Sequence, residues 1–448
     1  MKWRKFFMRA APKDKFTKQE KSWILYDWAN SVYATNIMAA IFPIYFTAVA
    51  GEDTVGMQWW GYGTSLATLI VAVMAPILGS LGDYKGMKKK FFTIFMLVGV
   101  FCTLIMAVFD NWQMLLVGYV LSYIGFAGSC LFYDSFLTDV TTRDRMDKIS
   151  AWGYAMGYIG GSTIPFLISI GILLVMGMDN PTAVKIVVVL TSVWWGLFSI
   201  PMMRNVKQTY YLEGRPHHMV KAAFTNVGAT LRSIVKNRGL LFYLLAYFCY
   251  IDGVGTVIHM STSYGSTLGL DTTGMILALL VTQIVAMPCS ILFGRVSKKV
   301  GSIRMIAIAI GVYFLICCVG FYMGYIVEID PIHSNGLALT LFWCMAFLVG
   351  TVQGGIQALS RSYFSKLVPP DKSNEFFGFF DIFGKFATVV GPFLVAFVTG
   401  LTGRSSFGIL SLMLLFAIGG VLLFVGRKPM REAEMAALQA RNGKLRFP

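Results

Sequence analysis

The sequence predicts an all-α integral membrane protein with twelve transmembrane helices in two pseudo-symmetric six-helix bundles. Its composition is the first reason: 56% of the residues are hydrophobic, 13% are charged, and the mean hydropathy is +0.66. Soluble domains have about 25% charged residues. The other two reasons are long apolar runs and basic residues that gather on alternate sides of them. Only helices and closed barrels satisfy their backbone in lipid, and these runs do not alternate as barrel strands do.

Twelve runs are long enough to be spans, since a transmembrane helix needs about 20 mostly apolar residues. The seventh and tenth runs contain several polar groups, but they keep the required length. We predict the spans at residues 22–49, 58–81, 91–109, 112–137, 148–176, 183–203, 239–264, 273–293, 303–327, 336–364, 375–400 and 405–426.

Basic residues mark one side of these spans. Of the 38 lysines and arginines, 35 lie in the two terminal segments and in every second connection or the span ends beside it, whereas the other side has only Lys185 and Arg404. By the positive-inside rule the basic side faces the cytoplasm. We therefore expect both termini in the cytoplasm and the protein in the plasma membrane. The net charge of +16 is then a topology signal, and we expect no nucleic-acid partner.

The longest polar interruption divides the chain into six spans and six spans, an arrangement known from transporters built of parallel repeats. Weak internal similarity supports this division, because two separated landmarks repeat at nearly the same offset. Asp27 of the first span lies 225 residues before Asp252 of the seventh, and Pro165 of the fifth lies 227 residues before Pro392 of the eleventh. The predicted organisation is a cytoplasmic tail (1–21), an N-terminal bundle (22–203), a cytoplasmic central loop (204–238), a C-terminal bundle (239–427) and a cytoplasmic tail (428–448).

Several motifs resemble those of one transporter family. The segment "GSLGDYKGMKKK" (Gly79–Lys90) resembles the cytoplasmic-loop signature of the major facilitator superfamily. "YDWANS" (Tyr26–Ser31), "DGVGTVIHM" (Asp252–Met260) and the segment Gly354–Lys385 resemble its vacuole-effluxer, autophagy-related branch. That branch includes fungal vacuolar amino-acid exporters and uncharacterised bacterial members. The resemblance implies the major facilitator fold and an amino-acid substrate that is exported.

Ionisable residues inside spans are the candidate site residues, because an ionised side chain at the bilayer centre costs roughly 2.5–3.5 kcal/mol. Asp27, Asn30 and Tyr33 lie on or beside one small, polar face of the first span. This face predicts a substrate or proton site. Two alternatives for Asp27 remain: a gate at the cytoplasmic mouth, or a structural role in the first helical turn, where the helix dipole favours an acid.

Asp252, Thr256 and His259 form a polar stripe near the middle of the seventh span. An aspartate and a histidine two turns apart predict a proton relay. The alternative is a hydrogen-bond network that packs helices together.

The tenth and eleventh spans contain further candidates. Gln353 and Gln357 are expected to line a cavity, and Arg361 is either a gate or an anchor to lipid headgroups. Asp381 and Lys385 are four residues apart, so they can form a structural ion pair or contact the solute.

Charges near the cytoplasmic ends predict a gate. Asp134 is expected at the membrane interface, close to the end of the fourth span. Asp83 is expected to face Arg143 and Arg145 of the next cytoplasmic loop. The superfamily resemblance implies that this contact is a charge latch, which holds the cytoplasmic side closed.

The sequence contains no recognisable ATP-driven engine. "GFFDIFGKF" (Gly378–Phe386) lacks the glycine spacing and the serine or threonine of a P-loop. We expect no enzyme activity, no cofactor and no metal. The predicted function is secondary active transport of a small polar solute by alternating access, coupled to protons, in a monomer that contacts only solute, protons and the bilayer. The alternatives are a transporter of a lipid, sugar or hydrophobic drug, and a receptor or scaffold that moves nothing.

Overall fold

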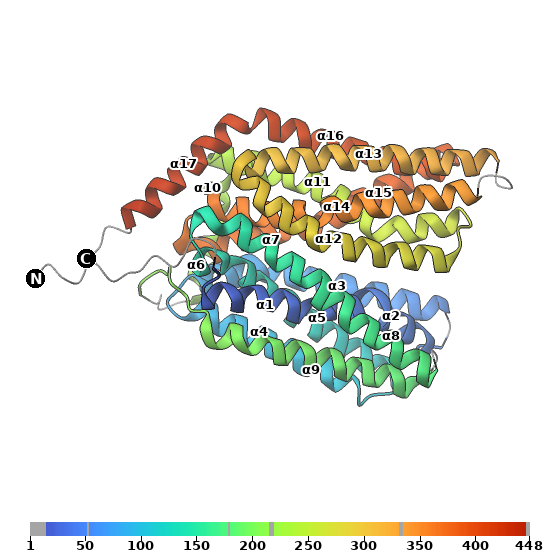
Figure 1. Cartoon of the computed structure of the whole chain (residues 1–448). Helices are drawn as coiled ribbons and strands as arrows, with labels where there is room; N and C mark the ends of the chain where they lie inside the picture. The colour runs from blue at the N-terminus through green and yellow to red at the C-terminus, as the bar shows by residue number, and fades with distance from the viewer. Residues whose placement is uncertain (1–14, 52, 178–179, 215–218, 331–334, 445–448) are drawn as a thin grey trace, which may run out of the picture.

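The computed structural model describes the chain except residues 1–14, 52, 178–179, 215–218, 331–334 and 445–448. Its described part is helical throughout apart from short connections (Figure 1). Eleven helical segments in this part are long and apolar enough to cross a bilayer, and a bent first segment raises the number to twelve. The all-helical prediction is therefore confirmed.

The first half of the chain contains α1 to α9. Its helices are α1 (Lys18–Tyr33), α2 (Phe42–Val49), α3 (Asp53–Gly82), α4 (Met87–Met106), α5 (Trp112–Ser135), α6 (Leu137–Val140), α7 (Met146–Met156), α8 (Ile164–Met176) and α9 (Pro181–Asn205). A π-helical segment, η1 (Ala34–Ala40), connects α1 to α2, a second, η3 (Gly157–Thr163), connects α7 to α8, and the short 3-10 turn η2 (Arg143–Arg145) precedes α7.

The second half contains α11 to α16 and is joined to the first by α10. The helices are α10 (Met219–Lys236), α11 (Arg238–Thr267), α12 (Thr272–Val300), α13 (Ser302–Ile329), α14 (Asn335–Leu367), α15 (Ser373–Thr402), α16 (Ser405–Val425) and α17 (Arg427–Lys444). The 3-10 turn η4 (Pro370–Lys372) precedes α15. The two halves lie side by side (Figure 1).

Most spans begin and end within a few residues of the predicted limits, and most helices extend beyond them. The largest difference is at α12, which continues to Val300, seven residues past the predicted end at 293. The first helix begins at Lys18, where Thr17 and Glu20 form a capping box: the Glu20 amide donates to Thr17 Oγ1 at 3.1 Å, and the Thr17 amide donates to Glu20 Oε2 at 2.8 Å. Asp27 therefore lies more than two turns inside α1, so the predicted first-turn role for Asp27 is wrong.

Two helices fall in segments that were expected to be a loop and a tail. They are α10 in the central segment 204–238 and α17 in the C-terminal segment 428–448. Both are polar enough to stay below the hydropathy of a span, and each buries one narrow face against the bundle. Ala223, Thr230 and Ile234 are buried on α10, and Met430 and Ala433 on α17.

The halves meet at the end of the molecule where Lys18 of α1 and Lys444 of α17 lie, which we call the terminal end (Figure 1). There α15 packs against α3, while α7 packs against α12 and α14. Glycines permit close approach in both contacts. A Cβ on Gly79 of α3 would lie 2.4 Å from the Asn374 carbonyl oxygen, and one on Gly294 of α12 would lie 2.5 Å from the Ala151 Cβ.

Candidate functional site

A buried cation, Arg361 of α14, lies between the halves. Its Nη1 donates to Asp134 Oδ1 at 2.8 Å, and its Nη2 donates to Asp27 Oδ2 at 3.2 Å. Both carboxylates belong to the N-terminal half, on α5 and α1, and the arginine side chain is only 3% exposed. Removal of one partner from a buried ion pair costs about 3–5 kcal/mol, because the other charge remains without compensation. Of the two predicted roles for Arg361, a gate and an anchor to lipid headgroups, the anchor is wrong, because the side chain is buried between acids of the other half.

Aromatic rings enclose this guanidinium. The Arg361 Cζ lies 4.7 Å from the ring centre of Trp23, 5.3 Å from that of Tyr133 and 4.5 Å from that of Tyr154. A desolvated cation–π contact contributes about 2 kcal/mol. The Tyr133 hydroxyl also donates to Asp27 Oδ2 at 2.7 Å, so this tyrosine contacts both the carboxylate and the guanidinium.

Helix α7 completes the binding site of the arginine. Arg361 Nε donates to Ser150 Oγ at 2.9 Å, and Nη2 donates to the Ser150 carbonyl oxygen at 3.2 Å. Gly153 is required one turn further on, since a Cβ there would lie 2.4 Å from Asp27 Oδ2. We call Arg361, Asp27 and Asp134 the central bridge.

A second ionic contact joins the halves nearer the terminal end. Asp147 of α7 accepts from Lys366 Nζ and from Ser362 Oγ, both at 2.6 Å, and from Ser302 Oγ at 2.9 Å. These three donors lie on α14 and at the start of α13, in the opposite half. Ser297 Oγ of α12 also donates to Asp147 Oδ2 at 3.2 Å, so this acid contacts three helices of the C-terminal half at once.

The contact between α3 and α15 uses a helix N-terminus. Asp83, directly after α3, accepts from the Asn374 amide at 3.0 Å, from Asn374 Nδ2 at 2.8 Å and from the Glu375 amide at 3.1 Å. The first amides of a helix have no partner within it, and an acid satisfies them. Burial raises the pKa of Asp83 to about 8, against the opposing effects of Lys88 and of these amide hydrogen bonds.

The predicted pairing of Asp83 with two arginines is wrong. Arg145 Nη2 lies 2.8 Å from Glu20 Oε2, and Arg143 Nη2 lies 2.8 Å from Glu434 Oε1 of α17. Asp83 is turned into the α15 N-terminus instead, while the arginines have acids of α1 and α17 within reach. Arg143 still joins the two halves, through a helix that the sequence did not reveal.

Asp381 and Lys385 of α15 form the ion pair predicted from their spacing. The Asp381 side chain is 25% exposed, and Asp134, in the opposite half, is 28% exposed and within electrostatic reach of it. Asp134, in the last turn of α5, therefore lies among charges of both halves. The central bridge and this pair together contain three acids and two bases, so the cluster has one net negative charge when every group is ionised.

The predicted polar stripe of Asp252, Thr256 and His259 on α11 contains two buried residues and one exposed residue. Asp252 is fully buried, and both of its oxygens accept from the Gly391 amide of α15, at 3.0 and 2.9 Å. Thr256 is also buried and donates to the Asp252 carbonyl oxygen at 2.8 Å. His259 is exposed. The geometry favours the helix-packing alternative for Asp252 and Thr256 over a shared proton relay with His259.

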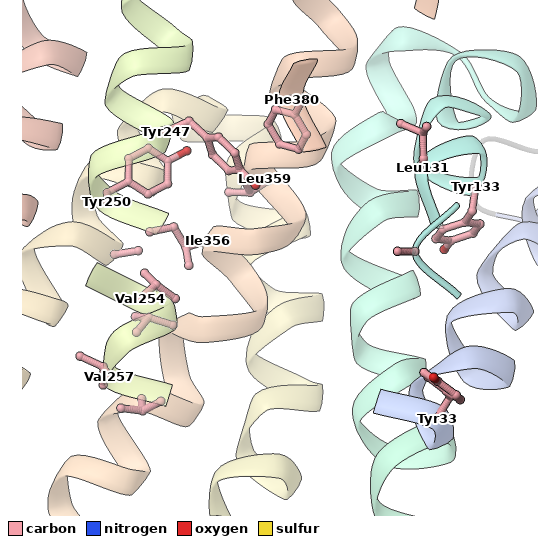
Figure 2. Close-up of a cluster of buried hydrophobic side chains, with 14 of the residues drawn as sticks. Tyr33, Leu131, Tyr133, Tyr247, Tyr250, Val254, Val257, Ile356, Leu359 and Phe380 are labelled. Carbon is pink, nitrogen blue, oxygen red and sulfur yellow. The ribbon is translucent and has the colours of Figure 1, made fainter. Parts of the chain in front are cut away.

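The other predicted residues of α1 lie inside the N-terminal half. Tyr33 is fully buried, its ring centre lies 4.8 Å from that of Phe126, and its hydroxyl shares a 2.7 Å hydrogen bond with Ser122 Oγ. Figure 2 shows Tyr33 and Tyr133 on one side, and Tyr247, Tyr250 and Phe380 of the other half opposite them. Asn30 is buried as well. These two side chains pack within the bundle because α1 turns this face towards its neighbours.

The two glutamines of α14 differ. Gln357 Oε1 accepts from the Tyr158 hydroxyl of η3 at 3.1 Å, which is a contact between the halves. Gln353 is buried on the same helix. Only Gln357 therefore has a recorded contact at the boundary where a cavity was expected.

Three aromatic residues around Arg361 were not predicted from the sequence: Trp23, Tyr133 and Tyr154. They come from α1, α5 and α7, and no spacing along one helix indicates that these three helices converge. The buried pair of Lys88 with Asp139, at 2.7 Å, was missed for the same reason.

An all-helical protein with two packed halves and ion pairs at their boundary has the architecture of a major facilitator transporter. Solved structures with this fold resemble it closely. A bacterial homologue of the iron transporter ferroportin, in an outward-facing state, has a TM-score of 0.69 and 12% identity, over 92% of this chain and 98% of that one. The proton:xylose symporter XylE has a TM-score of 0.67 and 11% identity, over 91% and 94%. At such identities the likeness shows the fold alone.

The chain belongs to the vacuole effluxer Atg22-like family, whose family model matches residues 60–144 and 138–434. A "MFS-type transporter YxiO" of Bacillus subtilis (strain 168), described as uncharacterized, is 45% identical over 420 residues, which are 91% of this chain and 95% of that protein. Autophagy-related protein 22 of Coccidioides immitis (strain RS) is 24% identical over 449 residues, 84% and 74% of the two chains. The protein is thus a membrane transporter of the major facilitator type rather than an enzyme.

Proposed function

We propose that the chain is a secondary active transporter that exports small polar solutes, with amino acids as the first candidates. The central bridge is the observation that carries this proposal. Arg361 belongs to one half and its two acids to the other, so the bridge must break when the halves separate at the terminal end. Alternating access by rocking of two repeats requires such a contact, one that forms in one state only.

The charges near the bridge support a zwitterionic solute. A carboxylate of the solute can replace Asp27 or Asp134 at Arg361, and an ammonium group can bind the acids that the arginine leaves. The net negative charge of the cluster leaves room for one further positive charge, which a proton or the solute can supply. Apolar drugs would make no use of these charges, and a sugar could form hydrogen bonds with them but would bring no charge of its own.

We propose that Asp27 and Asp134 are the groups that couple transport to protons. Both share one arginine and both are partly exposed, whereas Asp252 is sealed against α15. Protonation of either acid would weaken its hold on Arg361 and so favour separation of the halves.

The orientation is part of the same proposal. Most of the basic residues that the structure describes lie at the terminal end, so we propose that this end, with both termini, is cytoplasmic in a plasma membrane. The contacts described above then close the cytoplasmic side, and the state is open to the outside. Each chain contains both halves of the site, so a monomer suffices for transport.

Counterflow into proteoliposomes tests the substrate class. Proteoliposomes that contain the purified chain are loaded with one unlabelled solute. Uptake of labelled amino acids is then compared with that of labelled xylose and of a hydrophobic dye. Counterflow of labelled amino acids is the expected result, and counterflow of xylose or dye alone would contradict the substrate.

Proton coupling is tested in a separate assay, in which a proton gradient drives amino-acid uptake into unloaded proteoliposomes. This uptake should collapse when an ionophore dissipates the gradient, and full gradient-driven uptake in its presence would contradict the coupling.

A further inference from the structure

A groove of about 650 Å³ lies at the terminal end of the N-terminal half, beside the turn between α3 and α4. Four lysines line it, three from the α3–α4 turn and the start of α4, and one from the segment after α9. The complete lining is Lys85, Gly86, Lys89, Lys90, Thr93, Ile94, Lys207, Gln208 and Tyr211.

The described lining residues of this groove include no acid. The nearby Lys88 points elsewhere, since its Nζ is bound to Asp139 Oδ2 at 2.7 Å. The Lys85 Nζ lies 5.1 Å from the ring centre of Tyr211, a cation–π contact that supplies no negative charge. Four like charges around one groove repel one another, and a bound anion would remove that repulsion.

The start of α4 adds to the positive potential. The helix begins at Met87, its first turn has no acidic residue, and the Gly86 cap makes no side-chain hydrogen bond. The N-terminal amides of a helix favour an anion, and lysines in the first turn are the reverse of the usual preference. The sequence therefore tolerates an unfavourable local charge at the place where the groove lies.

The groove continues into an apolar stripe on the outside of α4. Ile94 is the last lining residue, and Ile94, Leu97 and Phe101 are all exposed at the spacing of one helical face. From Lys90 to Phe101 the helix rises about 16 Å. That length matches the hydrocarbon thickness of one leaflet, about 15 Å.

We propose that this groove binds an anionic phospholipid, with the headgroup phosphate among Lys85, Lys89, Lys90 and Lys207 and an acyl chain along the α4 stripe. Basic pockets beside transmembrane helices suit anionic headgroups. A soluble phosphate would use the lysines but not Ile94, Leu97 and Phe101. The occupant that uses both parts of the groove is a lipid.

Native mass spectrometry of the purified full chain in detergent tests this site. The chain is titrated with dioleoyl phosphatidylglycerol, with dioleoyl phosphatidylcholine and, in a separate arm, with inorganic phosphate. The variant Lys90→Gln/Lys207→Gln removes two lining lysines. Lys298→Gln/Lys299→Gln is the matched control, because these exposed lysines end α12 at the same end of the molecule and lie outside the groove.

The expected result is a loss of phosphatidylglycerol affinity of about 25-fold in the groove variant, roughly fivefold for each lysine. The control should change by less than twofold, and phosphatidylcholine binding should not respond to either variant. Equal losses in both double variants would overturn the proposal, since they would report general surface charge. Displacement of phosphatidylglycerol by millimolar phosphate would also overturn it, in favour of a soluble anion. If the double variant does not fold, Lys207→Gln alone should lose about fivefold.

Discussion

Asp27 and Asp252 occupy corresponding places in the first helix of each half, yet their surroundings differ. Asp27 binds Arg361 of the opposite half and is 13% exposed, whereas Asp252 is fully buried and binds the Gly391 amide of its own half. An acid whose partner lies across the boundary must change partner when the halves move. An acid whose partner moves with it does not. Position in the repeat therefore does not determine the role of these residues.

The two acids share one feature, which makes the difference instructive. Each lies against a glycine of a neighbouring helix: a Cβ on Gly153 would be 2.4 Å from Asp27 Oδ2, and one on Gly391 would be 2.9 Å from Asp252 Oδ1. The local packing is thus alike in the two halves. The arginine from the opposite half, together with the Tyr133 hydroxyl, distinguishes the Asp27 site.

The largest effect is expected for Arg361→Ala. The substitution removes the cation that Asp27 and Asp134 share. Removal of one partner from a buried ion pair costs about 3–5 kcal/mol. Counterflow should fall at least 100-fold, while the exposed Arg404→Ala at the far end should keep at least half of the activity. Comparable losses in both variants would remove the distinction between a bridging and a peripheral arginine.

A tenfold or greater loss of transport is expected for Asp27→Asn, because a hydrogen bond to a charged group contributes about 1.5–3 kcal/mol. Asp252→Asn should change transport by less than twofold and should instead lower the thermal unfolding midpoint by a few degrees. Counterflow and unfolding are measured on the same preparations. The opposite assignment, with Asp252 essential for transport and Asp27 for stability, would break the comparison.

A loss of about fivefold is expected for Gly79→Ala, since the new Cβ would meet the Asn374 carbonyl at the contact of α3 with α15. Gly61→Ala on the same helix is the control, because no atom lies within 4 Å of its Cβ position. The initial rate of uptake measures both. Equal rates for the two variants would show that the α3–α15 contact does not limit the transport cycle.

The smallest expected effect concerns pH and Asp83. In the packed state its pKa is raised to about 8, and in water it would return to about 3.9. The packed state therefore binds the proton more tightly, so its stability falls as pH rises from about 4 to about 8 and levels off above. Labels across the terminal end should report more open molecules at pH 8 than at pH 6, and Asp83→Asn should reduce this difference. An unchanged response in Asp83→Asn would contradict this origin.

The helices and one ion pair could be predicted from the sequence, whereas the contacts between distant helices could not. Spans are visible because lipid requires long apolar runs, and Asp381 with Lys385 is visible because both lie on one turn of one helix. Arg361 was a candidate without a partner, because its two acids come from helices distant in sequence. Asp83 was paired wrongly, since backbone amides leave no trace in the composition. The amphipathic period of α10 and α17 was the one available signal that was not used.

The central claim is that the Arg361 bridge keeps the terminal ends of the two halves together. Double electron–electron resonance between spin labels at Arg204 and Lys298, the exposed ends of α9 and α12, tests it in a background without native cysteines. Short distances should dominate in the parent chain, and Arg361→Ala should shift most molecules to longer distances. An unchanged distance distribution in Arg361→Ala would contradict the account.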